Sequence, residues 1–402
     1  MVQGNATLIV DFGNSSTKGT VLFGKDAKTG RFREKSFDIP NVFAPISEDY
    51  VVSADYSTET SSIIKVNSMI NGQNVVGSYC NGEVQRKERA VTTIKPTATI
   101  KKFDAPATVL SCHLAFLHAA KVIMRMQNVT DFAQLDINWK VVTLLPPGDL
   151  EVGAEKMVDL ISKTTEVDST YPAAKFPVKV DMVQVLPEGY CAYIGTVYDK
   201  GQTFRPENRF LTEETVIVFD IGAGTTDCLI IENNKLVQNS KHTITQGGNN
   251  VFQLVKRKLQ LAGLELTDEA IRNGVVKGSV KDGAKVIDIT GYVNEAKAEV
   301  AQKIISAFYD FVELSDIKVR SIGYVLVCGG GSMKDSECEK IRPISEMLIQ
   351  NFKTLSPNAE LVAIPTHTVT KDSADGTPYR VDEQISPRFL NLVGASILAE
   401  IL

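Results

Sequence analysis

Apolar and polar positions follow two different periods along this chain, and these periods predict strands and helices in turn. Residues 5 to 40 consist of short apolar runs broken by polar turns, which is typical of successive strands. From Thr108 to Met126 the apolar residues recur at intervals of three and four, which predicts a helix. A strand from Trp139 to Leu145 follows and ends at a Pro-Pro-Gly break.

The second half of the chain repeats this style. Strands at 216–245 precede a Gly-Gly turn and a helix to about Ala262. The clearest helical pattern runs from Asn294 to Leu314, and a strand from Tyr324 then leads through a glycine turn into a helix over roughly 335–352. This order of elements predicts an α/β protein with two similar halves.

Composition narrows the class of protein. The 402 residues indicate two or three domains. The 43 basic and 48 acidic side chains give a net charge of −5, which argues against direct affinity for DNA phosphates. The sequence has neither a secretory signal pattern nor an uninterrupted apolar run of about 18 residues. The six cysteines form no C-x-x-C pair, which favours reduced thiols. We therefore expect a cytoplasmic protein without a membrane or nucleic acid as direct partner.

A short pattern occurs twice, at Asp11 to Lys18 and at Asp220 to Asp227. In each copy an Asp ends an apolar run, a glycine follows two residues later, and small hydroxyl residues come next. A second apolar run continues after each copy, so both predict a strand, a tight turn and a strand. Lys18 stands where the other copy has Asp227.

The residue types in these turns suit anion binding, because glycines and small hydroxyl residues let backbone N–H groups approach an anion closely. One Asp-x-Gly turn alone would more simply be a plain hairpin, since both residues favour turns. Two copies with matched flanking strands favour the phosphate interpretation. Two such hairpins facing each other would hold a polyphosphate and its metal.

A third pattern lies near the end of the chain, where a buried-type strand from Tyr324 to Cys328 runs into three glycines. Glycines there let the backbone approach a flat or anionic ligand at a helix start. The same turn could also serve packing alone.

These elements, in this order, resemble the motifs of the actin-like ATPase superfamily, which also includes heat-shock chaperone ATPases and sugar kinases. The two hairpins resemble its phosphate-1 and phosphate-2 motifs, and Val325 to Met333 resembles its adenosine motif. Leu186 to Tyr193 is similar to its first connecting helix. Pro387 to Ser396 is similar to the second, including a Gly-Ala pair for close helix packing. Within the superfamily the chain is most similar to bacterial ParM-type plasmid-segregation proteins.

The resemblance implies an actin-like (ribonuclease H-like) α/β fold, with two similar domains around a nucleotide cleft. It places domain I at residues 1–200 and domain II at residues 201–385. The C-terminal helix, residues 386–402, is expected to return to domain I.

The resemblance also implies roles for individual residues. Asp11 and Asp220 would hold Mg²⁺ through water, and Lys18 would contact the β- and γ-phosphates. Glu188 would orient or deprotonate the attacking water, so the expected catalytic residues are Glu188, Asp220 and Asp11. The alternative for Glu188 is an exposed acid at a helix start. The residues expected to bind the nucleotide are Gly13, Asn14, Ser15, Ser16, Lys18, Gly222, Ala223, Gly224, Thr225, Gly329, Gly330, Gly331, Ser332 and Met333. Weaker candidates for the ribose are Lys256, Lys258 and Glu265.

The implied function is a polymerising ATPase that uses ATP or GTP with Mg²⁺ and forms cytomotive filaments. Its expected partners are further copies of itself and a DNA-binding adaptor of the ParR type at a centromere-like site, for segregation of plasmid or phage DNA. Fold does not decide function, so a sugar- or acetate-type kinase and a chaperone-type ATPase remain alternatives.

Six basic residues gather between Arg86 and Lys102. They have no interleaved aromatic residues, and Glu83 and Glu88 dilute their charge, which favours a solvated surface over a nucleic-acid patch. If this stretch is functional, it resembles the mobile subdomain that contacts the next subunit in actin-like filaments.

Overall fold

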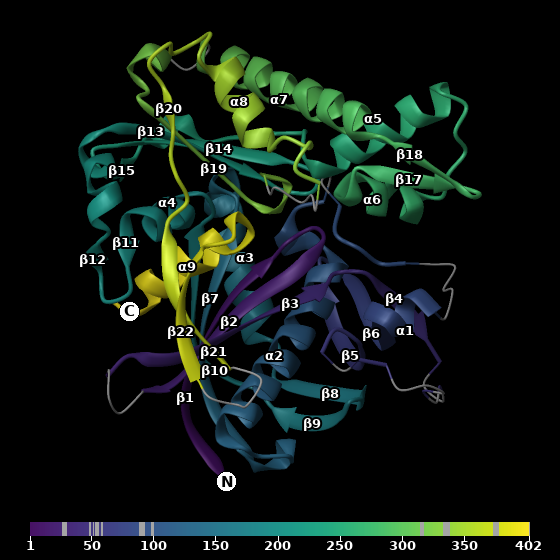
Figure 1. Ribbon diagram of the computed structural model, residues 1–402. Coiled ribbons are helices and arrows are strands. Elements are labelled where there is room, and N and C mark those ends of the chain that lie inside the picture. The colour runs from purple at the N-terminus through teal and green to yellow at the C-terminus, as the bar shows by residue number, and fades with distance from the viewer. Residues whose placement is uncertain are drawn as a thin grey trace. The chain divides into compact units, whose positions relative to one another are not determined.

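The computed structural model describes residues 1–25, 30–47, 50, 52, 56–57, 59–87, 93–97, 100–313, 317–332, 338–372 and 378–401 (Figure 1). The chain divides into two compact units: Met1–Pro187 with Leu398–Leu402 form unit 1, and Glu188–Ile397 form unit 2. The sequence analysis places these boundaries at 200 and 385 instead. The difference concerns two short segments, 188–200 and 386–397, which belong to unit 2.

Unit 1 contains a five-stranded sheet in the order β10-β7-β1-β2-β3. Strands β10, β7 and β1 run parallel, and β2 and β3 pair antiparallel beside them. The last five residues of β1 are all buried, as expected for a central strand. The strands are β1 (Val2–Phe12), β2 (Ser16–Lys25), β3 (Phe32–Pro40), β7 (Leu135–Leu145) and β10 (Lys179–Pro187).

A second, antiparallel sheet of unit 1 has the order β4-β6-β5-β8-β9. Its strands are β4 (Phe43–Ile46), β5 (Ser62–Ile70), β6 (Gln73–Asn81), β8 (Glu166–Tyr171) and β9 (Ala173–Pro177). The helices of the unit are α1 (Gly82–Lys87), α2 (Pro106–Gln127) and α3 (Leu150–Ser162).

Helix α2 forms the centre of unit 1 and confirms the helix predicted from Thr108 to Met126. It contacts β1 and β2 of the first sheet and β5, β6 and β8 of the second (Figure 1). Pro106 occupies its first turn, where a missing N–H costs nothing. Among the described helices, α2 is long and apolar enough to cross a membrane, but its most apolar part is entirely buried within the protein. The apolar side chains of α2 therefore pack in the hydrophobic core of unit 1.

Unit 2 contains a sheet in the order β15-β14-β13-β19-β20, with β16 also paired to β14. Its strands are β13 (Thr215–Ile221), β14 (Thr226–Glu232), β15 (Lys235–Leu236), β16 (His242–Ile244), β19 (Tyr324–Cys328) and β20 (Glu360–Leu361). Separate hairpins are β11 (Tyr198–Asp199) with β12 (Thr203–Phe204), β17 (Ser279–Asp282) with β18 (Lys285–Asp288), and β21 (Thr366–Asp372) with β22 (Pro378–Gln384).

Several helices pack with this sheet, and α7 contacts both α5 and α8 (Figure 1). The helices are α4 (Tyr190–Val197), α5 (Gly248–Leu261), α6 (Asp268–Lys277), α7 (Thr290–Glu313), α8 (Ile344–Phe352) and α9 (Leu390–Ala399). Helix α7 confirms the predicted helix from residue 294 to residue 313, and residue 314 lies outside the described part. The helix predicted over 335–352 begins only at Ile344; Pro343 caps it, and a proline disfavours helical geometry in the residue before it. Residues 335–337 of that prediction lie outside the described part.

The two units repeat one arrangement of strands. In unit 1, β1 pairs antiparallel with β2 on one side and parallel with β7 on the other. In unit 2, β13 pairs antiparallel with β14 and parallel with β19. The prediction of two similar α/β halves is therefore confirmed. Each repeat begins with one of the two Asp-x-Gly hairpins.

Candidate functional site

The first hairpin places Asp11 directly opposite Lys18, because β1 and β2 pair in that register. The Lys18 ammonium lies 2.7 Å from Oδ2 of Asp11, and both side chains are largely buried. The turn between them is closed by the N–H of Gly13, which donates to the carbonyl of Ser16. The Gly13 amide thus shapes the loop, which leaves the neighbouring residues Asn14 and Ser15 as the better candidates for phosphate contact.

A second lysine reaches the same carboxylate from a distant segment. The ammonium of Lys102 lies 3.3 Å from Oδ1 of Asp11, and only 13 % of its side chain is exposed. The prediction of a solvated surface is therefore wrong for Lys102. Its neighbour Lys101 fits that prediction better, since its side chain is 57 % exposed and pairs with Asp149.

Opposing effects act on the carboxyl group of Asp11. Burial on its own would raise the pKa of Asp11, but the charges and hydrogen bonds of Lys18 and Lys102 outweigh burial and hold that pKa well below its usual range. Asp11 is therefore ionised at all ordinary pH values. Two ammonium groups around one carboxylate form a group of three side chains that attracts anions such as phosphate more than it attracts a bare cation.

Asn41, in the loop after β3, holds the turn of the first hairpin in place. Its amide nitrogen donates to the carbonyl of Gly13 at 2.7 Å. Its amide oxygen accepts hydrogen bonds from the hydroxyls of Thr17 at 2.6 Å and Ser111 at 3.0 Å. Asn41 is fully buried, and its bonds connect the hairpin residues Gly13 and Thr17 with Ser111 of α2.

The second hairpin repeats the register of the first. Asp220 lies opposite Asp227, as Asp11 lies opposite Lys18. The N–H of Gly222 donates to the carbonyl of Thr225 and closes the turn in the same way as Gly13 does. The turn residues Gly222 to Thr225 are partly exposed. The hydroxyl of Thr243 donates to Asp227 at 2.5 Å.

The start of α5 supports this second turn. The N–H groups of Gly248 and Asn249 donate to the carbonyls of Gly222 and Ala223, at 3.0 and 2.7 Å. At Gly247 a side chain would not fit, because a Cβ there would lie 2.7 Å from the Gly222 oxygen. The hairpin is thus fixed by backbone contacts.

Asp220 is held by a neutral side chain from α9. The amide nitrogen of Asn391 donates to Oδ2 of Asp220 at 2.5 Å. The amide oxygen of Asn391 accepts from the N–H groups of Gly189 and Ala192, at 2.9 and 3.1 Å, at the start of α4. One buried asparagine therefore connects the carboxylate to the helix start beside Glu188.

The predicted glycine turn lies directly against the second hairpin. Gly329 has φ +85°, and a Cβ there would lie 2.2 Å from Oδ1 of Asp220. A Cβ at Gly331 would lie 2.8 Å from the Gly222 oxygen, whereas the nearest described atom to a Cβ at Gly330 would be in the Arg388 side chain, at 3.8 Å. The hydroxyl of Ser332 donates to the Gly329 carbonyl at 2.6 Å. Met333, the last residue predicted here, lies outside the described residues.

Glu188 precedes α4 and is 7 % exposed, so it is not the exposed helix-start acid that the sequence left as its alternative. Burial, with the nearby charge of Glu188, raises the pKa of the Cys191 thiol. Gly189, which follows Glu188, has φ +71°, and a Cβ there would lie 2.8 Å from Leu229. A tight turn thus positions a buried acid at the start of a helix.

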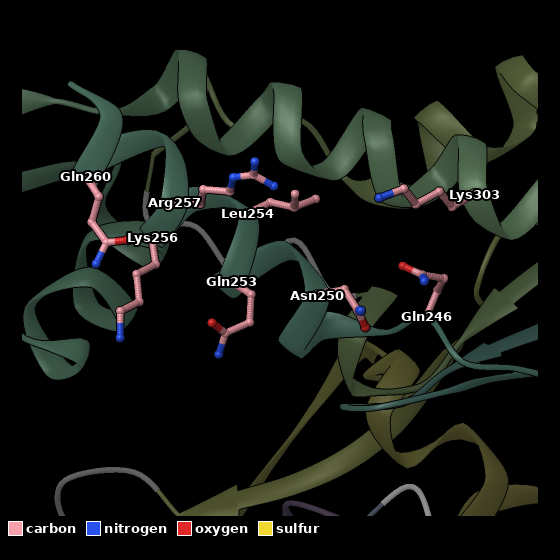
Figure 2. Close-up of a pocket in the computed structure, with 8 residues that line it drawn as sticks. All are labelled: Gln246, Asn250, Gln253, Leu254, Lys256, Arg257, Gln260 and Lys303. Atoms are coloured by element: carbon pink, nitrogen blue, oxygen red, sulfur yellow. The ribbon is translucent and has the colours of Figure 1, made fainter.

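A polar groove of about 440 Å³ runs along α5 in unit 2. Figure 2 shows amide and basic side chains of this helix at the groove, with one lysine contributed by α7. Of the weaker ribose candidates, Lys256 lines the groove, and its ammonium lies 2.7 Å from Asp268. Lys258 and Glu265 do not line it. The lining residues are Gln246, Asn250, Gln253, Leu254, Lys256, Arg257, Gln260 and Lys303.

The two predicted metal carboxylates differ in their fitness for Mg²⁺. Asp220 accepts from a neutral amide, so its negative charge suits a hydrated cation. Both oxygens of Asp11 face lysine ammonium groups, which does not suit direct coordination. Among the described residues, no group of three or more carboxylate, histidine or cysteine side chains could hold a metal. A magnesium ion here would thus depend on water and phosphate oxygens for most of its ligands.

Comparisons with known proteins bear on this arrangement. Residues 218–335, which run from the second hairpin past the glycine turn, match the family described as archaeal actin homologue MreB-like, C-terminal. No curated protein sequence matches significantly. Among solved structures, actin-like protein Alp7A is 15 % identical with a TM-score of 0.66, over 99 % of this chain and 97 % of that one.

Two further structures agree over nearly the full length. Bacillus thuringiensis ParM, solved with ATP, is 16 % identical with a TM-score of 0.60, over 98 % of this chain and 99 % of that one. A 15-stranded ParM filament from Clostridium botulinum is 14 % identical with a TM-score of 0.61, over 99 % of this chain and 100 % of that one. The chain has the actin-like fold.

The sequence analysis did not assign three residues to the candidate site: Asn41, Lys102 and Asn391. Each reaches its partner from far away in the sequence, so no local motif marks it. Asn391 has a signal in the sequence, because it is a polar residue between two leucines in a largely apolar helix.

Proposed function

We propose that this protein is a Mg²⁺-dependent nucleoside triphosphate hydrolase of the actin-like type, whose nucleotide state controls its assembly into filaments. The observation that carries the proposal is the pair of hairpins with identical register, each with a buried Asp at the end of its first strand. Phosphoryl transfer depends mainly on positioning and charge stabilisation, and this chain offers both.

The residues of the two hairpins have complementary roles in this proposal. Lys18 supplies a positive charge to the β- and γ-phosphates, and the turn amides of Asn14 and Ser15 donate to phosphate oxygens. In unit 2, Ala223, Gly224 and Thr225 do the same. When bound, Mg²⁺ would neutralise charge on the phosphates, with Asp220 as its main protein contact through water.

Glu188 is proposed to orient the attacking water. Its burial keeps competing solvent away, and the turn at Gly189 fixes its backbone. Asn391 links the start of α4 to Asp220, so the acid and the metal carboxylate keep a constant spacing within unit 2. The nucleoside is proposed to lie near the turn from Gly329 to Ser332 and the groove on α5.

Filament assembly and DNA segregation go beyond hydrolysis. Support comes from the similar structures, since one is a ParM filament and another is ParM with ATP. We propose that this chain likewise forms a homopolymer, using ATP or GTP, and that a DNA-binding adaptor of the ParR type at a centromere-like site connects filaments to plasmid or phage DNA. Head-to-tail contacts that do not close into a ring produce such open filaments.

The test combines sedimentation, light scattering and phosphate release, with ATP, ADP and a slowly hydrolysed ATP analogue over a concentration series. With ATP the protein should assemble above a critical concentration, and filaments should disassemble as ADP accumulates. Each tenfold difference in critical concentration between the two states corresponds to about 1.4 kcal/mol of differential affinity. Glu188→Ala should bind ATP normally, lose most turnover and form persistent filaments.

Glu155→Ala, which changes an exposed acid on α3, is the matched control and should behave as wild type. If ATP affinity and turnover fall together in Glu188→Ala, the acid is structural. A protein that hydrolyses ATP but remains monomeric at tens of micromolar with all three nucleotides is not a filament former, and the sugar- or acetate-kinase alternative then replaces this proposal.

A further inference from the structure

The phosphate hairpin of unit 1 has a second lysine, Lys102, which no sequence motif marks. Its ammonium lies 3.3 Å from Oδ1 of Asp11, while the ammonium of Lys18 lies 2.7 Å from Oδ2 of the same carboxylate. All three side chains are at most 13 % exposed. The two oxygens of one buried carboxylate thus each face a different lysine.

The short turn that bears Lys102 is fixed on several sides. The carbonyl of Lys102 accepts from the hydroxyl of Thr108 at 2.6 Å, in the first turn of α2. The next residue, Phe103, is buried against α3, where a Cβ at Gly153 would lie 2.2 Å from its ring. Asp104 accepts from the amide of Asn71 at 2.7 Å. The Lys102 backbone is therefore held in place before any ligand arrives, as a binding residue requires.

Neutralising Asp11 does not explain the second lysine. Lys18 already forms a close ion pair with Asp11, and bringing a second ammonium into a buried site costs desolvation and repulsion from the first. A bound triphosphate carries several negative charges and would repay this cost. The longer distance from Lys102 to Asp11 also leaves this lysine the weaker of the two partners of Asp11.

We propose that Lys102 is a second phosphate-binding lysine, which moves from Asp11 to an oxygen of the β- or γ-phosphate when the triphosphate binds. This inference rests on the proposed nucleotide function and adds a binding residue to it. Asp11 then serves as the anchor that orients both lysines, which fits its poor suitability as a direct metal ligand. As the lysine ammonium turns to the phosphate, one oxygen of Asp11 becomes available to water.

The test is calorimetric titration with ATP and with AMP of three proteins: wild type, Lys102→Gln and Lys101→Gln. Each titration is made in EDTA and then in Mg²⁺. Thermal unfolding of the same proteins without nucleotide measures their stability. Lys102→Gln should weaken ATP binding at least tenfold, change AMP binding less than twofold and leave the nucleotide-free melting temperature nearly unchanged. Lys101→Gln alters the neighbouring exposed lysine and should match wild type in all three measurements.

The outcomes separate the two proposals. If wild type binds no ATP at millimolar concentration, the proposed function itself fails. If wild type binds ATP and Lys102→Gln binds it equally well, only the role of Lys102 is overturned. A lower melting temperature of Lys102→Gln would then show that this lysine stabilises the fold. Should Lys102→Gln not fold, acylation of wild-type lysines followed by mass spectrometry replaces it. ATP and inorganic tripolyphosphate, but not adenosine, should protect Lys102, and equal labelling with and without them overturns the proposal.

Discussion

The two Asp-x-Gly hairpins have the same backbone conformation, but different groups hold it in place. In unit 1 the carbonyl of Gly13 accepts from a side chain, Asn41, and Asp11 is surrounded by positive charge. In unit 2 the carbonyl of Gly222 accepts from a backbone N–H at the start of α5, and Asp220 accepts from the neutral Asn391. The Asp carboxylate of one hairpin thus lies beside two ammonium groups, whereas that of the other accepts a hydrogen bond from an amide.

This difference has a structural cause. The second hairpin lies against two glycine turns, at 247–248 and 329–331, so main chain approaches main chain there. The first hairpin is contacted by side chains instead, and two of these, Lys18 and Lys102, carry a positive charge. Three substitutions below would break or sharpen this comparison, in order of decreasing effect.

Gly329→Ala should cause the largest effect, because its Cβ would lie 2.2 Å from Asp220 and the residue has φ +85°. Overpacking and backbone strain together should lower the stability of unit 2 by about 3 kcal/mol. Denaturant unfolding followed by circular dichroism would measure the loss. In Gly330→Ala, one residue further on, the nearest described atom to the new Cβ would be in the Arg388 side chain, at 3.8 Å. This variant should therefore unfold like wild type. Equal stability of the two variants would contradict the close packing of this turn.

Asn41→Ala should cost about 2 kcal/mol in unit 1, because it leaves the hydroxyls of Thr17 and Ser111 and the carbonyl of Gly13 without this partner. Since Asn41 supports the turn that carries Asn14 and Ser15 and is not itself proposed to touch phosphate, ATP affinity per folded molecule should fall less than in Lys102→Gln. Urea unfolding and ATP titration of the same samples would separate the two effects. Asn67→Ala, at an exposed position on β5, is the control. A loss of affinity without a loss of stability would assign Asn41 to ligand binding.

The smallest effect is that of a single histidine on stability one pH unit below 6.5, and this acid sensitivity should differ between the units. Burial lowers the pKa of His113 to about 4, and burial with the charges of Lys121 and Arg125 lowers the pKa of His118 well below its usual range. Both histidines are neutral in the folded state, whereas the unfolded chain takes up protons near pH 6.5. Their stabilising effect is therefore complete above pH 6.5 and is lost as the pH falls toward 4, by at most about 1.4 kcal/mol per pH unit for each histidine.

Thermal unfolding at pH 7.5 and 5.5 would measure this effect, with the two units followed separately by hydrogen exchange. His118→Gln should reduce the pH dependence of unit 1 and leave unit 2 unaffected. In unit 2, burial also lowers the pKa of His242, but this ring is less buried and stacks on Phe311. If unit 2 loses its hydrogen-exchange protection before unit 1 on acidification, the predicted difference in acid stability between the units is wrong.

Much of this fold could be predicted from local patterns. Periodicity found α2 and α7 to within a few residues, and the repeated Asp-x-Gly pattern found two hairpins in identical register. The start of α8 was placed too early, because the helical spacing of apolar residues continued across the break at Pro343.

The site was harder to predict than the fold, because its supporting residues are distant in sequence. The sequence around Lys102 has the composition of a solvated basic stretch, and only tertiary packing shows that Lys102 is buried beside Asp11. Asn41 and Asn391 belong to no motif, because a hydrogen bond between distant residues needs only a suitable side chain in the right place. The predicted roles of Glu188, Asp220 and the turn residues remain predictions about chemistry.

The bond between Asn391 and Asp220 has a consequence for how the protein is made. Synthesis delivers the chain to the folding environment from the N-terminus onward, and compact units generally fold as they emerge. The side chains described here around the turn of unit 1, those of Asn41, Lys102 and Ser111, have all been added by residue 111, although β7 follows later. The hairpin of unit 2 must wait for Asn391, 171 positions after Asp220. A nascent chain on the ribosome therefore contains these side-chain partners of its first Asp-x-Gly hairpin well before it contains Asn391, the partner of its second.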